Sequence, residues 1–499
     1  MALSKRVGGS FFGLAAVVLA GACSSDSNDL TSADIGSAVQ PLAVSTAVSV
    51  EAITVRAEAD NQVVVQVLPN ASCLLRWPDT KPTDGGLEVV SDPEGNARFH
   101  LTTSGPTADS FSVALDCRDS SGKSETYEVS YRATADAPVL TAPVTRSGTP
   151  RPALSGDPKA YTNAELVSLG FPPRPEASED SEAYQRWLEV VSKPATRLAG
   201  PLVVSRQDHV AYTQNWAGWR LDSEPAYTYA HGDWQVPLPL GESSTEGILD
   251  TSSLWVGLGD GIAPSQQGRG DMWQGGTEHD EYCITAPHSI HYCFRSYTPW
   301  VEVIHEVPND APTEDGTCCP SIIWSMALNP GDHIYTDIWI GDLSGNPNPG
   351  LNTPLYAWWY IQNVTTGQLL SQPGGWYYVN PGDQYPQHYP HDPWHGNLAE
   401  HDGQLPSFVS FTGGSAEWIL ERTANDYQVP PHLAGFSTSP QIWNAGGWFD
   451  SNTSWQLYTS GSPELMIMTR TGQSSNWLAD AITPYNQPDR MLFRWYAHY

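Results

Sequence analysis

Charged side chains are scarce in this sequence, and cationic ones are the scarcer kind. Charged residues make up 16% of the 499 residues, and 24 Lys and Arg face 55 Asp and Glu, so the formal net charge is -31 at pH 7. A nucleic-acid partner needs a basic patch that neutralises its phosphates. The charge balance therefore argues against DNA or RNA binding.

Long apolar runs are also missing after the first 22 residues, where no stretch approaches the 18 or so apolar residues of a membrane helix. Internal repeats of 20 to 50 residues are not evident. Trp (20), Tyr (22), Gly (43) and Pro (41) are plentiful instead. This profile is typical of an extracellular β protein, and the length predicts two or more folded units.

Three common chemical motifs are absent. The sequence has no Cys-x-x-Cys, no Gly-x-Ser-x-Gly and no His-Glu-x-x-His. These absences argue against a structural zinc site and against ordinary serine and zinc peptidases. We expect no metal and no cofactor.

The N-terminus has the features of an export signal. Lys5 and Arg6 precede an apolar segment, and Leu19-Ala20-Gly21-Ala22-Cys23 resembles a bacterial lipobox. We predict a signal peptide at 1–23, lipidation at Cys23 and a polar tether at 24–45. The protein would be an outer-membrane lipoprotein held only by that lipid, or alternatively a plainly secreted protein.

The other six cysteines suit disulfides in an oxidising compartment. Cys73 and Cys117 would pair locally, and Cys283 with Cys293 is attractive, whereas Cys318 and Cys319 would more readily bond different partners than each other. The disulfide candidates are Cys73, Cys117, Cys283, Cys293, Cys318 and Cys319.

Residues 46–137 alternate apolar and polar positions, which is typical of strands. Phe111 to Cys117 and Tyr127 to Tyr131 flank a turn at Asp119-Ser120-Ser121-Gly122. We interpret this part as a small Ig-like β-sandwich, although Trp77 lies too near Cys73 for a true immunoglobulin pattern.

Residues 138–206 form a Pro-rich connector with two short helices. Thr162 and Glu165 make a capping box for a helix that Gly170 ends, and Ser178 is expected to begin the second. The connector is a spacer or a propeptide packed over a site. Cleavage between Lys193 and Arg206 would release the C-terminal part.

Residues 207–499 are almost purely strand and turn, which predicts two large antiparallel sheets packed as a β-sandwich. The chain is thus expected to be all-β apart from the helical connector. The expected strands are 215–219, 253–258, 300–307, 333–340, 357–364, 416–420, 464–468 and 491–496.

Several motifs in this C-terminal part, taken in order, resemble those of the glutamic peptidases (eqolisin family). The matching segments are Asn215-Trp216-Ala217-Gly218, Leu254-Trp255-Val256-Gly257-Leu258, Trp273-Gln274-Gly275-Gly276, Trp300-Val301-Glu302, Pro330-Gly331-Asp332-His333-Ile334, Asn363-Val364-Thr365-Thr366-Gly367-Gln368 and Ala416-Glu417-Trp418-Ile419-Leu420-Glu421.

The resemblance implies a concanavalin-like sandwich with a catalytic pair, Gln274 and Glu421. It also implies a groove, for which the candidate substrate-binding residues are Asn215, Trp255, Trp300, Glu302 and Glu417. Alternation along a strand supports this arrangement, because Glu417 and Glu421 share one face while Trp418 is on the other.

A glutamate and a glutamine together can hydrolyse a peptide bond without a metal. Glu421 would take a proton from water and return it to the leaving amine, while the Gln274 amide would stabilise the oxyanion. With an ordinary glutamate pKa near 4, activity would lie at acid pH. We therefore expect a monomeric acid endopeptidase acting on proteins or peptides.

Three alternatives are kept. The segment His388 to His401, rich in His and Asp, could hold a metal but is more readily a lid over the groove. The sandwich could be a non-catalytic carbohydrate binder, whose tryptophans stack on sugars. Less readily, Glu302 and Glu421 could be the acid and base of a glycosidase.

Overall fold

The structure is a computed structural model in which the described residues belong to one compact unit, Ser45–Tyr499. The described residues are 48–77, 86–107, 109–119, 121–142, 148–176, 178–198, 203–205, 216–222, 227–240, 249–259, 272–286, 290–304, 321–323, 326–341, 355–371, 378–379, 415–423, 432–449, 454–459, 463–469 and 477–496.

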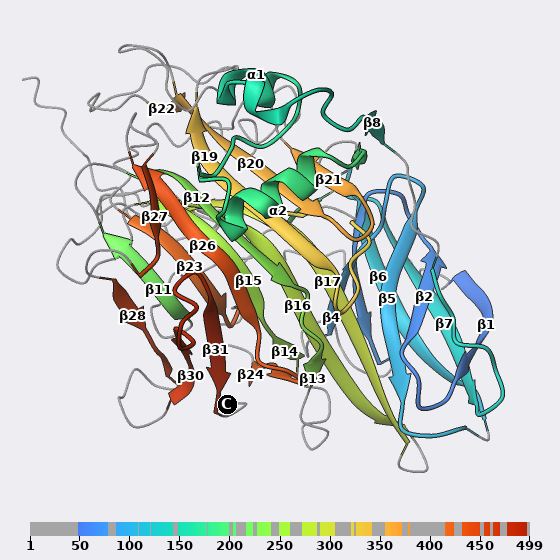
Figure 1. Cartoon of the computed structure of the whole chain (residues 1–499). Coiled ribbons are helices and arrows are strands. Elements are labelled where there is room, and N and C mark those ends of the chain that lie inside the picture. The colour runs from blue at the N-terminus through green and yellow to red at the C-terminus, as the bar shows by residue number, and fades with distance from the viewer. Residues whose placement is uncertain are drawn as a thin grey trace, which may run out of the picture. The chain divides into compact units, whose positions relative to one another are not determined.

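Three large sheets account for most of this part of the chain, as the sequence predicts for an all-β protein (Figure 1). The first, which we name the module sheet, has five strands in the order β1-β7-β6-β3-β4. Its strands are β1 (Val48–Arg56), β7 (Ser124–Thr134), β6 (Phe111–Asp119), β3 (Ala71–Arg76) and β4 (Leu87–Val90).

The second sheet, here the front sheet, has twelve strands. Its main path is β10 (Val203–Ser205), β18 (Ser321–Ile323), β17 (Ile290–Ile304), β16 (Met272–Ala286), β15 (Ser253–Gly259), β23 (Ser415–Glu421), β11 (Trp216–Asp222) and β28 (Glu464–Met466). Joined to it are β2 (Asn61–Gln66), β5 (Asn96–Thr103), β14 (Leu249–Thr251) and β24 (His432–Leu433).

The third sheet, here the back sheet, also has twelve strands. Its main path is β29 (Met468–Thr469), β30 (Trp477–Ile482), β31 (Met491–Trp495), β26 (Gln441–Phe449), β12 (Tyr227–Gln235), β19 (His333–Gly341), β20 (Leu355–Asn363), β21 (Gln368–Ser371), β9 (Ala195–Arg197) and β8 (Thr149–Arg151). Joined to it are β22 (Tyr378–Val379) and β27 (Ser454–Leu457), while β13 (Pro239–Leu240) and β25 (Gly435–Phe436) form a separate pair.

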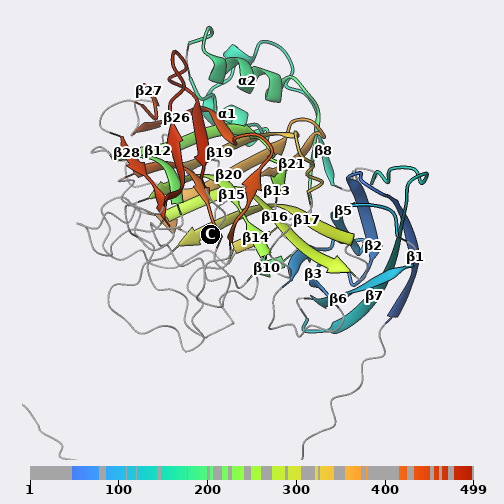
Figure 2. The same ribbon diagram turned by 90° about the horizontal axis from the view of Figure 1, so that it is seen from below.

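The front and back sheets pack face to face over one apolar core (Figure 2). Val256 and Trp418 of the front sheet approach Gly232 of the back sheet so closely that a Cβ on Gly232 would lie 2.9 Å from Val256. The Trp418 indole also donates a hydrogen bond of 2.7 Å to the backbone oxygen of His231. These contacts hold the two sheets as layers of one sandwich.

The strand predictions from alternation are confirmed in their positions, because each expected segment overlaps one of these strands, although the ends differ by several residues in places. The hairpin of β6 and β7 is confirmed as well, with Phe111 opposite Tyr131 and Leu115 opposite Tyr127. The sequence did not reveal the length of β16 and β17, which are 15 residues each.

Two helices, α1 (Asn163–Ser168) and α2 (Glu182–Val191), and the 3-10 helix η2 (Pro158–Ala160) form the connector. The capping box of Thr162 and Glu165 is present, but the prediction that Ser178 begins α2 is wrong. Ser181 is the N-cap, and its side chain accepts a hydrogen bond from the Tyr184 backbone N–H.

The helices pack on the outer face of the back sheet, where Leu166 and Trp187 share an aromatic cluster with Trp339 and Trp448 (Figure 1). Since the front sheet packs on the other face of the back sheet, α1 and α2 do not cover the front sheet's outer face. Among the described residues, no helix is long and apolar enough to cross a membrane.

A buried ionic group lies under this aromatic layer. His231 Nδ1 is 2.6 Å from Asp337, and His231 Nε2 is 3.6 Å from Asp233, with all three side chains fully buried. Burial alone would lower the pKa of His231, but the carboxylates of Asp337 and Asp233 raise it to about 9. The histidine is therefore cationic in the folded protein at acid and neutral pH.

His231→Gln should destabilise the protein most below pH 6.5. A raised histidine pKa stabilises the fold fully below the unfolded-state value of 6.5, and this contribution disappears as the pH rises through about 9. Urea unfolding at pH 6 should show a loss of about 3 kcal/mol, shrinking by pH 10. The partly exposed His291→Gln serves as the control, and an effect of His231→Gln that does not change with pH would contradict this account.

Candidate active site

Strand register brings the predicted site residues onto the outer face of the front sheet. Gln274 on β16 pairs with Glu302 on β17 and with Gly257 on β15, and Gly257 pairs with Glu417 on β23. Because side chains alternate along strands, Trp255 and Glu421 share this face, while Trp418 points into the core. Four predicted site residues, Glu302, Glu417, Trp255 and Glu421, therefore share one surface with Gln274.

Gln274 is held firmly at this face. It is 1% exposed, and its Nε2 donates a hydrogen bond to Glu302 Oε2. An amide nitrogen carries two hydrogens, so one remains for another acceptor. Among the described residues, no group forms a hydrogen bond with the Gln274 Oε1 atom. Glu302 thus fixes the orientation of the Gln274 amide.

Glu421 is also buried, at 3% exposed. Trp255 Nε1 donates a 2.8 Å hydrogen bond to Glu421 Oε2, and the Trp216 ring packs edge-on against Trp255 with centroids 5.1 Å apart. Burial raises the pKa of Glu421 to about 7, opposed by the indoles of Trp216 and Trp255 and reinforced by Glu417. The expectation of an ordinary glutamate pKa near 4 is therefore wrong for this buried carboxyl.

The register separates Gln274 from Glu421. Glu421 pairs with Ser253, which lies four residues from Gly257, so it is Glu417 that is level with Gln274. From strand spacings, the Cα atoms of Gln274 and Glu421 lie about 16 Å apart. Because side chains stand roughly perpendicular to a sheet, the side chains of Gln274 and Glu421 rise from the same face side by side.

Gly257 lies between Gln274 and Glu417 in this row. A Cβ on Gly257 would lie 2.8 Å from the Trp255 ring, which packs over the glycine. The absence of a side chain at this position therefore makes room for the indole that holds Glu421. The other predicted tryptophan, Trp300, donates a 2.9 Å hydrogen bond to Ser253 Oγ.

Two further carboxyls on this face were missed by the sequence reasoning. Glu278 and Asp280 continue the alternation of Gln274 along β16, and Glu278 pairs with Ser253 opposite Glu421. Burial raises the pKa of Glu278 to about 8, reinforced by Glu88 and Glu421, and raises that of Asp280 well above its ordinary value. The period of two along β16 was the signal that could have found them.

Two predicted disulfides are present, Cys73–Cys117 and Cys283–Cys293, each between neighbouring antiparallel strands. In the described part of the chain, one group of side chains has metal-ligand spacing, Glu281 with Cys283 and Cys293. Its cysteines are already bonded to each other and offer no thiolate. The predictions for Cys23, Asn215, Cys318, Cys319 and the His388 to His401 segment lie outside the described residues.

Comparison with protein-family models, with curated proteins and with solved structures finds no match for this chain.

Glu421→Gln should stabilise the folded protein at neutral pH. A raised carboxyl pKa means that the fold carries a penalty that begins above the ordinary value of 4.5 and is complete above about 7. Urea unfolding should therefore show a gain of about 3 kcal/mol at pH 8 and none at pH 3.5. The matched control is Glu179→Gln at an exposed position. If Glu421→Gln and the wild type are equally stable at pH 8, the raised pKa of Glu421 is refuted.

Proposed function

We propose that this chain is an acid-acting endopeptidase of the glutamic type, with Glu421 as general base and acid and Gln274 as oxyanion donor. The observation that carries the proposal is that β15 pairs with the strands of both residues and so places them on one buried face. Each is held by a second group of the predicted set, Gln274 by Glu302 and Glu421 by Trp255.

In the proposed hydrolysis, Glu421 transfers the protons and Gln274 stabilises the oxyanion. Ionised Glu421 takes a proton from a water molecule as the water oxygen attacks the scissile carbonyl carbon. The Gln274 N–H that Glu302 does not use donates to the oxyanion. Protonated Glu421 then gives its proton to the leaving nitrogen as the C–N bond breaks, which restores the carboxylate.

The buried carboxyls of this face make the folded protein more stable at acid pH than at neutral pH. Glu421, Glu278 and Asp280 all have raised pKa values, so the folded face binds more protons than the unfolded chain and gains stability as the pH falls from about 8 towards 4. A water molecule entering beside Glu421 would hydrate it and lower its pKa towards the ordinary value. The ionised base is then available at acid pH.

The finer architecture belongs to the same proposal. We assign 207–499 to a concanavalin-like sandwich, 46–137 to an Ig-like module and 138–206 to a connector. The two disulfides are compatible with an exported protein. Export, lipidation at Cys23, a monomeric state and peptide substrates are proposed on the sequence features alone.

The two alternatives, a non-catalytic carbohydrate binder and a glycosidase, are less well supported. The tryptophans of this face have structural partners instead of free rings for sugar stacking, because Trp255 donates a hydrogen bond to Glu421 and Trp300 donates one to Ser253. A glycosidase needs two catalytic carboxyls within about 9.5 Å of each other. Glu302 lies one strand further from Glu421 than Gln274 does, and its carboxylate already accepts the Gln274 hydrogen bond.

Gln274→Ala and Glu421→Gln should each abolish cleavage of a denatured protein between pH 2 and 7. Each change removes the sole oxyanion donor or the sole base of the proposed reaction, so we expect losses of at least about a hundredfold. The wild-type activity should resist pepstatin. Glu302→Gln should weaken the reaction less, because the amide keeps a partner.

The controls are Gln185→Ala and Glu179→Gln, the same changes at exposed positions of the connector. Glu417→Gln tests the carboxyl that is level with Gln274. If Glu417→Gln is inactive while Glu421→Gln stays active, the base has been misassigned. If the folded wild type cleaves nothing at any pH, the peptidase proposal fails.

A further inference from the structure

Residues 48–142 do not make a complete sandwich by themselves. Their module sheet faces a second layer to which the described residues of the same part contribute two strands, β2 and β5. The layer continues through β17, because Thr103 to His100 of β5 pair with Tyr292 to Arg295, and then through β16. The hairpin of β16 and β17 therefore supplies two strands of this second layer.

The apolar core of this part of the chain depends on the hairpin. Tyr282, Ile284, Tyr292 and Phe294 are buried in one cluster with residues of the module sheet such as Phe111. The rings of Phe111 and Tyr292 lie 3.6 Å apart between centroids. Without the hairpin these apolar surfaces would face water at a cost of roughly 25 cal/mol per Å².

Arg295 of β17 joins the two parts through charge. Its guanidinium lies 2.5 Å from Glu281 on the hairpin, donates a 2.8 Å hydrogen bond to Thr102 of β5 and is 3.8 Å from Asp60. It also donates to the backbone oxygen of Pro239 at 3.3 Å. Arg295 is 7% exposed, so its loss would leave buried acceptors and the Glu281 carboxylate uncompensated.

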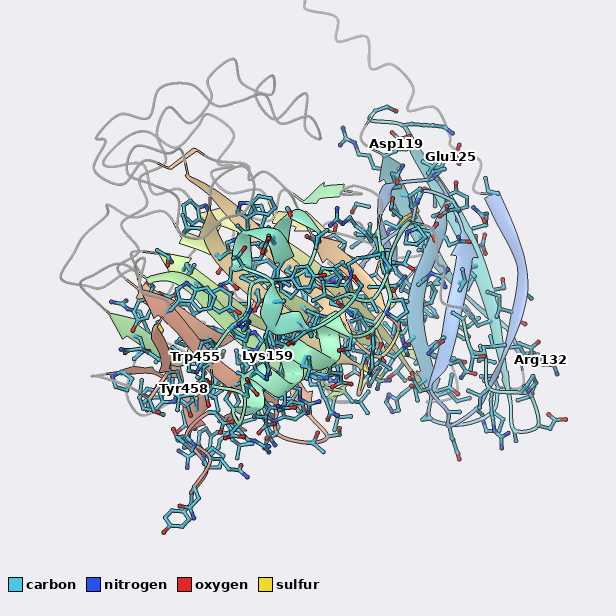
Figure 3. All side chains as sticks on the ribbon, turned by 45° about the horizontal axis from the view of Figure 1, so that its top comes forward. Asp119, Glu125, Arg132, Lys159, Trp455 and Tyr458 are labelled. Carbon is cyan, nitrogen blue, oxygen red and sulfur yellow. A yellow bond between two sulfur atoms is a disulfide. The ribbon has the colours of Figure 1, made fainter. Side chains whose placement is uncertain are left out.

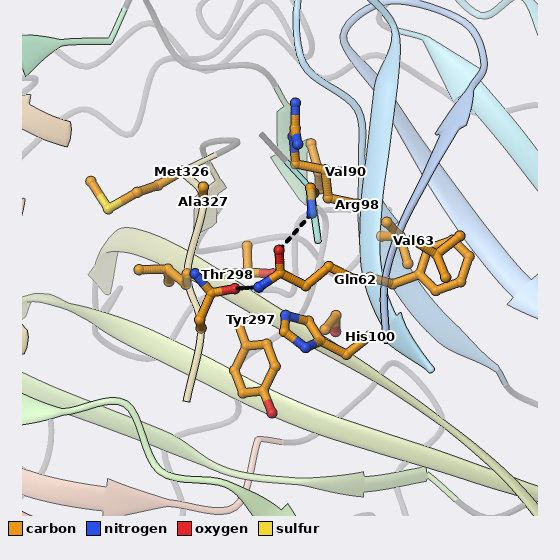
Figure 4. Close-up of a pocket in the computed structure, with 15 residues that line it drawn as sticks. Gln62, Val63, Val90, Arg98, His100, Tyr297, Thr298, Met326 and Ala327 are labelled. Carbon is orange, nitrogen blue, oxygen red and sulfur yellow. Dashed lines mark hydrogen bonds between the residues drawn. The ribbon is translucent and has the colours of Figure 1, made fainter. Parts of the chain in front are cut away.

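The space that remains between the two parts is small. Gln62, Arg98 and His100 line it from one side and Tyr297 and Met326 from the other (Figure 4). Its volume of about 50 Å³ is far below that of a ligand pocket. Gln62 crosses this space to Asn329, to which it donates a 2.6 Å hydrogen bond.

The hairpin also leads to the candidate active site. Along β16, Gln274, Glu278, Tyr282 and Ile284 have the same parity and so lie on one face of the strand. The module sheet covers the distal end of this face, and its strand β4 contacts both β16 and β17. It therefore closes one end of the face that carries Gln274 and Glu302.

We propose that residues 48–142 are a permanent part of the folded protein, completed by the hairpin of β16 and β17, and that they position the strands bearing Gln274 and Glu302. They are not a detachable propeptide. The effect on activity rests on the proposed peptidase function, whereas the association of the two parts does not.

The test is to insert a site for a sequence-specific protease between Ala142 and Gly148 of the full chain. Neither described disulfide crosses the cut, because Cys73–Cys117 lies before it and Cys283–Cys293 lies after it, so non-reducing electrophoresis should show two separate fragments. Size-exclusion chromatography at pH 5 should nevertheless show them eluting together, and they should separate only in denaturant. Separation in native buffer would overturn the proposal.

Arg295→Met in the cut protein should weaken the association by more than about tenfold. The matched control is Arg132→Met on the exposed surface of β7, where Figure 3 labels the side chain. An unchanged association in Arg295→Met would contradict the interface described here.

Peptidase activity in the cut Arg295→Met protein should fall as the fragments dissociate and return when the small fragment is added in excess. Full activity in the dissociated large fragment would overturn the positioning role. If the uncut wild type has no activity but the cut fragments remain together, the peptidase function fails and the permanent association stands.

Discussion

The antiparallel pairing of β16 with β17 is the interaction on which both halves of the structure depend. Fifteen residues of each strand pair without a break in register, from Met272 opposite Ile304 to Ala286 opposite Ile290. One end of this ladder carries Gln274 and Glu302, and the other carries the Cys283–Cys293 disulfide and the aromatic residues that complete the N-terminal sandwich. A shift of one residue would turn every one of these side chains to the opposite face.

Burial of polar groups is the second constraint on this molecule. The back sheet hides His231 between two aspartates, and the pairing keeps the histidine charged. The front sheet instead buries Glu421 and Glu278, and burial raises the pKa values of both carboxyls. Burying them costs less free energy when they are protonated. Lowering the pH keeps His231 charged beside its aspartates and protonates Glu421 and Glu278. Both effects stabilise the folded protein under acid conditions.

The sequence predicted the local features well, because alternation and capping depend on neighbouring residues. The strand at 415–421, with Trp418 inward and Glu421 on the other face, follows from a period of two, and both described disulfides were among the expected pairs. The start of α2 was misplaced because Ser178 and Ser181 are equivalent candidates for an N-cap.

Most of the features that the sequence did not reveal join distant segments. The pairing of Thr102 with Cys293 brings together strands that are far apart in sequence, and no motif marks it. The raised pKa of Glu421 has the same origin, since its burial results from the packing of separate strands. The family resemblance pointed to Gln274 and Glu421 as candidates but did not reveal that Glu417 is level with Gln274.

Hydrolysis of a defined peptide at pH 4 in ¹⁸O-labelled water, followed by mass spectrometry, tests the central claim most directly. If Glu421 activates water for direct attack, the two fragments should together equal the peptide plus one labelled water. The ¹⁸O should lie in the new carboxyl terminus, and no peptide should be attached to the protein. An unchanged peptide, or a covalent peptide adduct on the enzyme, would contradict the account.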